Sequence, residues 1–193
     1  MSNEDFSQDS HLSQPVNRDN SKFFLLIIGI PLGLLFSLPV LIKTFVAEAR
    51  YIPAGSMTPT LQVNARLIID KLSYHFQDPK RGEIVIFSPT EKLKKLNFNS
   101  PFVARVIGLP GDKVEVKGGL VYINNQALEE KYIQEPPKYN FGPVQVSSNS
   151  YFVLGDNRNN SYDSHYWGFV PRENIFGKAT QIYWPPERQG GIK

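Results

Sequence analysis

Residues 102–123 have the sequence FVARVIGLPGDKVEVKGGLVYI, in which short runs of β-branched and aromatic side chains alternate with glycine-containing turns. Val, Ile, Phe and Tyr favour extended backbone, and Gly beside Pro or a second Gly favours a turn. The runs 114–116 and 120–123 flank Lys117-Gly118-Gly119, which predicts a β-hairpin. Similar runs occur at 67–69, 83–87 and 151–154. The predicted fold class is therefore mostly β.

The composition of the 193-residue chain argues against several functions. A formal net charge of +3 is too small to indicate a nucleic-acid partner. There is no cysteine, so disulfides and thiolate chemistry are excluded. The three histidines, His11, His75 and His165, stand at unrelated positions, which argues against a zinc site. We expect no metal and no cofactor.

The N-terminal part of the sequence changes character twice. Residues 1–22 are polar and are predicted to be a disordered tail. Residues 23–42 carry no charge, which matches the length of about 20 residues that a helix needs to cross a bilayer, and we predict a transmembrane anchor over 23–46. The alternative is a cleaved secretory signal, since Ala47-Glu48-Ala49 has the small-x-small form of a cleavage site. A single domain over 50–184 and a C-terminal tail over 185–193 would complete the chain.

A possible nucleophile follows the apolar segment. Residues 51–61, YIPAGSMTPTL, place Ser56 directly after a glycine, between two prolines. A glycine permits a tight turn that exposes the hydroxyl, and the prolines keep the segment out of regular helix. An ordinary Pro/Gly/Ser turn is the alternative interpretation.

A second polar segment, residues 155–171, has the sequence GDNRNNSYDSHYWGFVP. It contains almost no aliphatic side chain between Asp156 and Phe169. Asp and Asn side chains can bond to their own backbone, so a self-bonded structural loop is one interpretation. A loop that positions polar groups for catalysis is the other.

Together the three segments resemble those of bacterial type I signal peptidases, which are membrane-anchored serine proteases of the S26 family. The matching motifs are IPxGSMxPTL around Ser56, RVIGLPGD from Arg105, and GDNRxNSxDS from Gly155. The resemblance implies a largely β fold with one N-terminal transmembrane helix and an apolar face on the bilayer. It also implies two kinds of partner, the signal peptides of preproteins and the lipid bilayer.

The resemblance also implies roles for individual residues. Ser56 would attack the scissile carbonyl, and its backbone N–H would contribute to the oxyanion hole. Ala54 stands where many members have a serine that donates the second oxyanion hydrogen bond. Ser161 would orient the general base, and Asp163 would pair with Arg105. The substrate pockets for the small side chains of an Ala-x-Ala sequence would be lined by Ile52 and Val103.

One position departs from the family at the centre of the chemistry. The family's general base is a lysine immediately before Arg105, and here that position is Ala104. A serine hydroxyl needs an adjacent base, and a methyl group cannot accept a proton. Lys113 lies past the Pro-Gly turn and is not expected to reach Ser56. Neither His75 nor His165 stands where some relatives carry a substitute histidine. The sequence therefore indicates no replacement base, and the chain is expected to be inactive or nearly so.

Three hypotheses follow. The first is a signal peptidase that removes signal peptides from exported preproteins, with Ala104 either introduced or natural. The second is a non-catalytic paralogue that binds signal peptides or a partner without cleaving. The third is a tethered relative of self-cleaving repressors, which fails because the chain has no DNA-binding module. The family implies a cytoplasmic tail and a domain on the other side of a plasma or thylakoid membrane. The sequence does not predict an oligomeric state.

Overall fold

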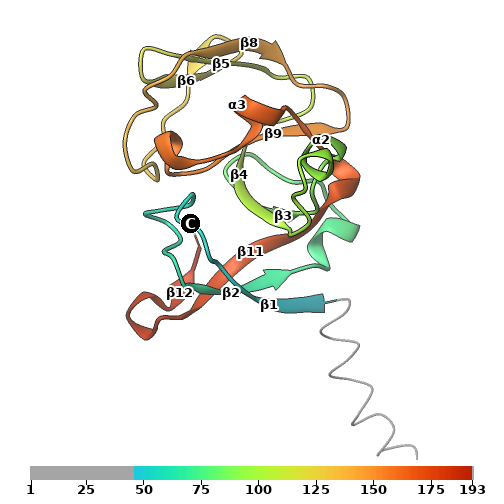
Figure 1. The fold of residues 1–193 in the computed structure, drawn as a ribbon, viewed down its shortest axis with the longest axis vertical. Helices are drawn as coiled ribbons and strands as arrows, with labels where there is room; N and C mark the ends of the chain where they lie inside the picture. Colours follow the sequence, from blue (N-terminus) through green and yellow to red (C-terminus); the bar gives the residue numbers. More distant parts are fainter. Residues whose placement is uncertain (1–45, 193) are drawn as a thin grey trace, which may run out of the picture. The chain divides into compact units, whose positions relative to one another are not determined.

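The computed structural model describes residues 46–192. The predicted tail 1–22 lies outside the described residues, and so does all of the predicted anchor 23–46 except Val46. None of the helices in the described range has both the length and the apolar character needed to cross a membrane. The described part of the chain is mostly β, as predicted (Figure 1).

Within the described residues, eight strands form the larger sheet, in the order β1-β2-β11-β3-β4-β9-β10, with β12 paired to β11. Every pairing in it is antiparallel. The strands are β1 (Ala47–Tyr51), β2 (Arg66–Asp70), β3 (Ile84–Phe87), β4 (Phe102–Gly108), β9 (Ser150–Leu154), β10 (Val170–Pro171), β11 (Ile175–Trp184) and β12 (Gly190–Gly191).

A smaller sheet of four strands has the order β7-β6-β5-β8 and lies at the top of Figure 1. Its strands are β5 (Lys113–Lys117), β6 (Leu120–Ile123), β7 (Gln126–Ala127) and β8 (Phe141–Gln145). The predicted hairpin is confirmed, because β5 and β6 pair with Lys117 opposite Leu120. Gly118 and Gly119 make its turn with φ of 60° and 81°, which residues with a side chain rarely adopt.

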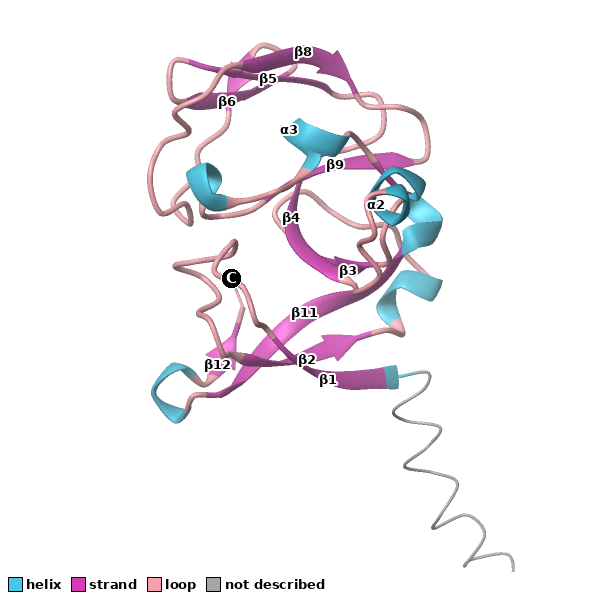
Figure 2. Ribbon diagram, viewed as in Figure 1, coloured by secondary structure: helices cyan, strands magenta, loops and turns pink. Residues whose placement is uncertain are grey.

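The helices of the described residues are all short (Figure 2). They are α2 (Glu91–Lys95), α3 (Ser164–Trp167), and the 3₁₀ turns η2 (Ser73–His75), η3 (Arg158–Asn160), η4 (Arg172–Asn174) and η5 (Pro186–Arg188). The Thr90 hydroxyl caps α2 by accepting from the Leu93 N–H, and the Asp163 carboxylate caps α3 by accepting from the His165 N–H. Side-chain caps of this kind satisfy N–H groups that a helix start leaves unpaired.

The sequence pattern did not predict β11, the longest strand among the described residues. It lies between β2 and β3, so it joins the two halves of the larger sheet. The strands β1 and β8 were not predicted either, because their sequences AEARY and FGPVQ lack a run of β-branched residues. In the segment expected to be a C-terminal tail, β12 pairs with β11.

Candidate active site

Most of the predicted site residues line one cavity of about 800 Å³. Three segments form its walls: the turn that carries Ser56, the first half of β4 with the loop before it, and the polar loop after β9. The predicted residues that line it are Ile52, Ala54, Ser56, Val103, Ala104, Ser161 and Asp163. Arg105 is the one predicted site residue that is not part of its wall.

The Ser56 turn is held in place by its apolar neighbours. Met57 and Leu61 are fully buried in a cluster that also contains Ile52. The Leu61 N–H donates to the Met57 carbonyl over 2.8 Å, and the Thr58 N–H to the Gly55 carbonyl over 3.2 Å. Within residues 46–192, neither the Ser56 N–H nor its hydroxyl is engaged in a hydrogen bond. Among the described residues, nothing therefore occupies the hydrogen-bonding capacity of either group, and Ser56 lines the cavity.

The position of the family's base is part of the apolar core. Ala104 pairs with Val85 across β3 and β4 and is only 4% exposed. Its methyl group belongs to the core cluster that contains Val106 and Trp167. Among the described residues that line the cavity, none is a lysine or a histidine. The wall near Ser56 therefore contains no amine or imidazole that could take a proton from its hydroxyl.

The loop after β9 clamps the Ser56 turn from the other side. The Asn157 N–H donates to the Ser56 carbonyl over 3.0 Å. The Asn157 side-chain amide donates to the Gly55 carbonyl at 3.2 Å and to the Thr58 hydroxyl at 3.0 Å. This loop is thus bonded to the Ser56 turn as well as to itself, which favours the second of the two interpretations given for it.

The expected pair of Asp163 with Arg105 is wrong. Arg105 is bidentate on Asp156, with Nε–Oδ1 at 2.8 Å and Nη2–Oδ2 at 2.7 Å. Asp163 instead accepts from the Gly155 N–H at 3.0 Å and contacts His165 Nδ1 at 2.7 Å. The reason lies in the register: Leu154 of β9 is opposite Arg105 of β4, so the chain delivers Asp156 to the guanidinium just after the strand ends.

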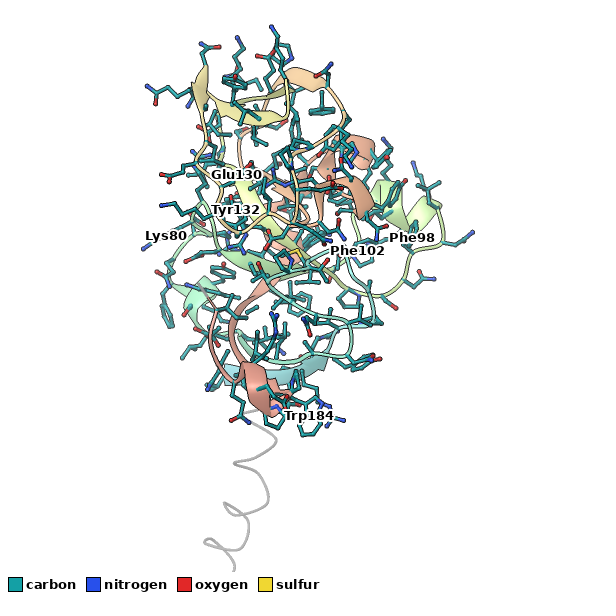
Figure 3. All side chains as sticks on the ribbon, turned by 90° about the vertical axis from the view of Figure 1, so that its left-hand side faces the viewer. Lys80, Phe98, Phe102, Glu130, Tyr132 and Trp184 are labelled. Atoms are coloured by element: carbon teal, nitrogen blue, oxygen red, sulfur yellow. The ribbon has the colours of Figure 1, made fainter. Side chains whose placement is uncertain are left out.

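The sequence did not predict the buried polar network that lies behind the cavity. The Thr60 hydroxyl donates to Asp156 over 2.5 Å, which ties the Ser56 turn to the Arg105–Asp156 pair. The Arg105 guanidinium also lies 4.0 Å from the centre of the Tyr132 ring. Tyr132 and Glu130 are labelled in Figure 3. Burial raises the pKa of Tyr132, and the nearby Glu130 carboxylate raises it further.

A second ion pair extends this network. Arg158 makes two hydrogen bonds to Glu130, at 2.7 Å and 2.5 Å, and its side chain is fully buried. Burial alone would lower the pKa of Arg158, but the bonds to Glu130 outweigh that effect and raise it. Arg158 belongs to the polar loop, so the sequence could have identified it as a candidate for the site. Glu130 lies in a stretch with no motif around it, so nothing in the sequence pointed to it.

Gly155 is required where the polar loop meets the Ser56 turn. A Cβ at this position would lie 2.5 Å from the Ser56 carbonyl oxygen and would also overlap the Ser161 hydroxyl. Real Cβ atoms do not make such contacts, so Gly155→Ala should separate Ser56 from Ser161. We expect it to lower the melting temperature and, on the expectation that the cavity takes an Ala-x-Ala peptide, to weaken the binding of that peptide. As the matched control, Gly111→Ala places a Cβ in open space at a distant turn. It should lower the melting temperature through its φ of 84° without a comparable loss of peptide affinity. Equal losses of affinity in the two variants would contradict the contact argument.

The comparisons with known proteins agree on one family. Residues 21–184 match the family described as "Signal peptidase, peptidase S26". The chain is 62% identical over 149 residues to "Probable signal peptidase I-2" of Synechocystis sp., covering 77% of this chain and 68% of that protein. It is 60% identical over 163 residues to "Signal peptidase I" of Leptolyngbya laminosa, covering 83% and 80%. With "Thylakoidal processing peptidase 1, chloroplastic" of Arabidopsis thaliana it shares 40% identity over 154 residues, covering 77% of this chain and 45% of that protein.

Proposed function

The chain belongs to the type I signal peptidase family, peptidase S26, and we propose that it recognises signal peptides at Ala-x-Ala-type sites with Ser56 as the nucleophile. The observation that carries this proposal is the shared cavity. Ser56 lines it together with Ile52 and Val103, whose apolar side chains suit small apolar residues of a substrate. Pockets of this kind select by size, because a larger side chain would clash with their walls.

The oxyanion hole in this proposal is incomplete. The Ser56 N–H is one donor, and its lack of a partner within residues 46–192 supports that role. Ala54 has no hydroxyl to act as a second donor. The loss of one such donor lowers turnover by about 10² to 10³ in other serine proteases.

Among the described residues, the cavity wall also lacks the base that the reaction needs. Ala104 occupies the place of the lysine, and the described lining residues offer no substitute. We propose that the chain with Ala104 binds its substrate but turns it over very slowly. Ser161 lines the same cavity as position 104, where it would orient a base if one were introduced. Asp163 holds the closing loop through Gly155 and His165.

A non-catalytic paralogue is the alternative function. The observation in its favour is that the Ala104 methyl is well packed in the core, so the site shows an apolar wall rather than a void. In that case the chain would bind signal peptides, or a partner of an active enzyme, without cleaving. Peptide binding is common to both functions, and cleavage after restoration of the lysine separates them.

The membrane arrangement is proposed with the function. We propose that residues 23–46 anchor the chain, that 1–22 form a cytoplasmic tail, and that a domain over 50–184 acts on the far side of a plasma or thylakoid membrane. Support comes from the sequence of residues 23–42 and from relatives whose names include a thylakoidal processing peptidase. Protease accessibility of the tail and the domain in sealed vesicles tests this topology.

The specificity is tested by mapping the cut. The full-length chain carrying Ala104→Lys, in detergent, is incubated with a preprotein that contains Ala-x-Ala, and the new N-terminus is determined by mass spectrometry. We expect a single cut after the second alanine, and none when both alanines are replaced by leucine or when Ser56→Ala is added. Cleavage of the leucine substrate at the same site would contradict the proposed selection by size.

A further inference from the structure

One end of the cavity is lined by aromatic side chains that the small substrate residues do not need. Four of them form what we term the aromatic rim: Phe98, Phe102, Tyr162 and Tyr166. Neighbouring rings lie 5.6 Å apart for Phe98 and Phe102, 5.7 Å for Phe98 and Tyr162, and 5.1 Å for Tyr162 and Tyr166. The rim therefore runs without a break from the loop before β4 to the loop after β9, and Figure 3 shows the part of it formed by Phe98 and Phe102.

Hydrogen bonds fix the rim from behind. The buried Trp167 donates from Nε1 to the Tyr162 carbonyl at 3.0 Å. Lys92 of α2 donates from Nζ to the carbonyl of Tyr166 in α3 at 3.2 Å, which joins the two short helices. Even so, Phe98, Tyr162 and Tyr166 remain 40%, 41% and 59% exposed. A fixed but incompletely covered aromatic surface can bury the apolar side chain of a ligand without rearrangement.

The rim and the small-residue pockets lie on opposite faces of β4. Val103 packs against the core cluster that contains Ile52. Its neighbours Phe102 and Ala104 pack against the other cluster, with Phe87 and Trp167. Successive side chains of a strand point to opposite faces, so this division follows from the pleat. Phe102 is also displaced from Ala104 by about 7 Å along the strand, the distance of two residues.

An extended substrate has the same alternation. Within the described residues, β9 pairs with β4 only from Arg105 onward, so the edge of β4 at 102–104 is open on that side. If an extended substrate pairs with this edge and its two small residues face Ile52 and Val103, its middle residue points to the opposite face of β4. That face carries the aromatic rim. We infer that, given the proposed function, the aromatic rim is a subsite for the middle residue and favours a large apolar or aromatic side chain there. The preference would be a property of this chain's rim residues and independent of the missing base.

The missing base makes the inference testable by binding alone. Peptides with Ala-Phe-Ala, Ala-Ala-Ala, Ala-Asp-Ala and Leu-Phe-Leu at the cleavage site are titrated onto the full-length Ala104 chain in detergent. We expect the phenylalanine peptide to bind about tenfold more tightly than the Ala-Ala-Ala or Ala-Asp-Ala peptide. The double variant Phe98→Ala/Tyr162→Ala should reduce this preference to about twofold or less, because it removes two of the rings. Phe76→Ala is the control, since Phe76 is 83% exposed and lies outside the cavity.

The outcomes distinguish a failure of the proposed subsite from a failure of the proposed function on which it rests. Equal binding of Ala-Phe-Ala and Ala-Ala-Ala, with Leu-Phe-Leu still rejected, overturns the subsite and leaves the proposed function intact. Failure of every peptide to bind, or acceptance of Leu-Phe-Leu, overturns both. If the double variant does not melt cooperatively, Phe98→Ala alone takes its place, because Phe98 lies in a loop and is 40% exposed. A preference that survives loss of the Phe98 ring unchanged also overturns the subsite.

Discussion

Ala104→Lys should raise the rate of preprotein cleavage by about 10⁴-fold or more, which is the scale of loss when a serine protease loses its base. The amine would stand on β4 at the wall of the cavity that Ser56 and Ser161 also line. Because position 104 is almost completely buried, desolvation should lower the pKa of the introduced lysine. A neutral amine can then accept the Ser56 proton near neutral pH.

The pH dependence of cleavage by the Ala104→Lys variant shows whether the introduced amine acts as the general base. The amine acts as a base only when it is neutral, so kcat/KM should rise with pH through the lowered pKa and then level off. Ala104→Met is the matched control, since it adds a side chain of similar length without an amine. It should show no gain at any pH. Cleavage by the unmodified chain within tenfold of the lysine variant, abolished by Ser56→Ala, would show that another base is present.

The local strand signals were reliable where apolar residues follow one another. The predicted runs at 67–69, 114–116, 120–123 and 151–154 fall entirely on strands, and the run at 83–87 does so except for its first residue. The strand β11 was not predicted because two of its four buried positions carry small residues. Its inward positions include Gly177 and Ala179, and a Cβ on Gly177 would overlap the Ile69 side chain. A register shift between Ala179 and Gln181 then breaks the period of two. Close packing against β2 thus removed the hydrophobic pattern that would have revealed the strand.

The candidate site was predicted to the level of segments but not of partners. The motifs around Ser56, Ala104 and Ser161 come together at one cavity, as the resemblance implied. The choice between Asp156 and Asp163 as the partner of Arg105 depends on the register of β9 against β4, which no local pattern encodes. The same holds for Glu130, which reaches Arg158 from a connection between strands. Long-range ion pairs of this kind can be assigned only once the pairing and register of the strands are known.

Asp156→Ala should be the most destabilising single change among the polar residues around the cavity. The Arg105 and Asp156 side chains are 2% and 0% exposed, so removal of the carboxylate leaves a buried guanidinium without its charge partner. Such a change costs about 3–5 kcal/mol of unfolding free energy. For a domain of this size, we expect the melting temperature to fall by about 10 °C. Thermal and urea unfolding of the full-length chain, followed by circular dichroism, measure both quantities.

Two further variants distinguish an unpaired charge from a general loss of packing. Glu91→Ala breaks the exposed pair with Lys94, whose side chains are 80% and 52% exposed, and should leave the melting temperature unchanged. The double variant Arg105→Met/Asp156→Leu removes both charges and keeps most of the buried volume. Because a buried pair is often replaceable by apolar residues, it should recover most of the lost stability. A double variant as unstable as Asp156→Ala would mean that the bonds of Arg105 to the Gly82 carbonyl and of Thr60 to Asp156 matter more than the charge. In that case the hydrogen bonds of the network, and not its charges, hold the Ser56 turn in place. Asp156→Asn should then preserve peptide binding better than Asp156→Ala or the double variant.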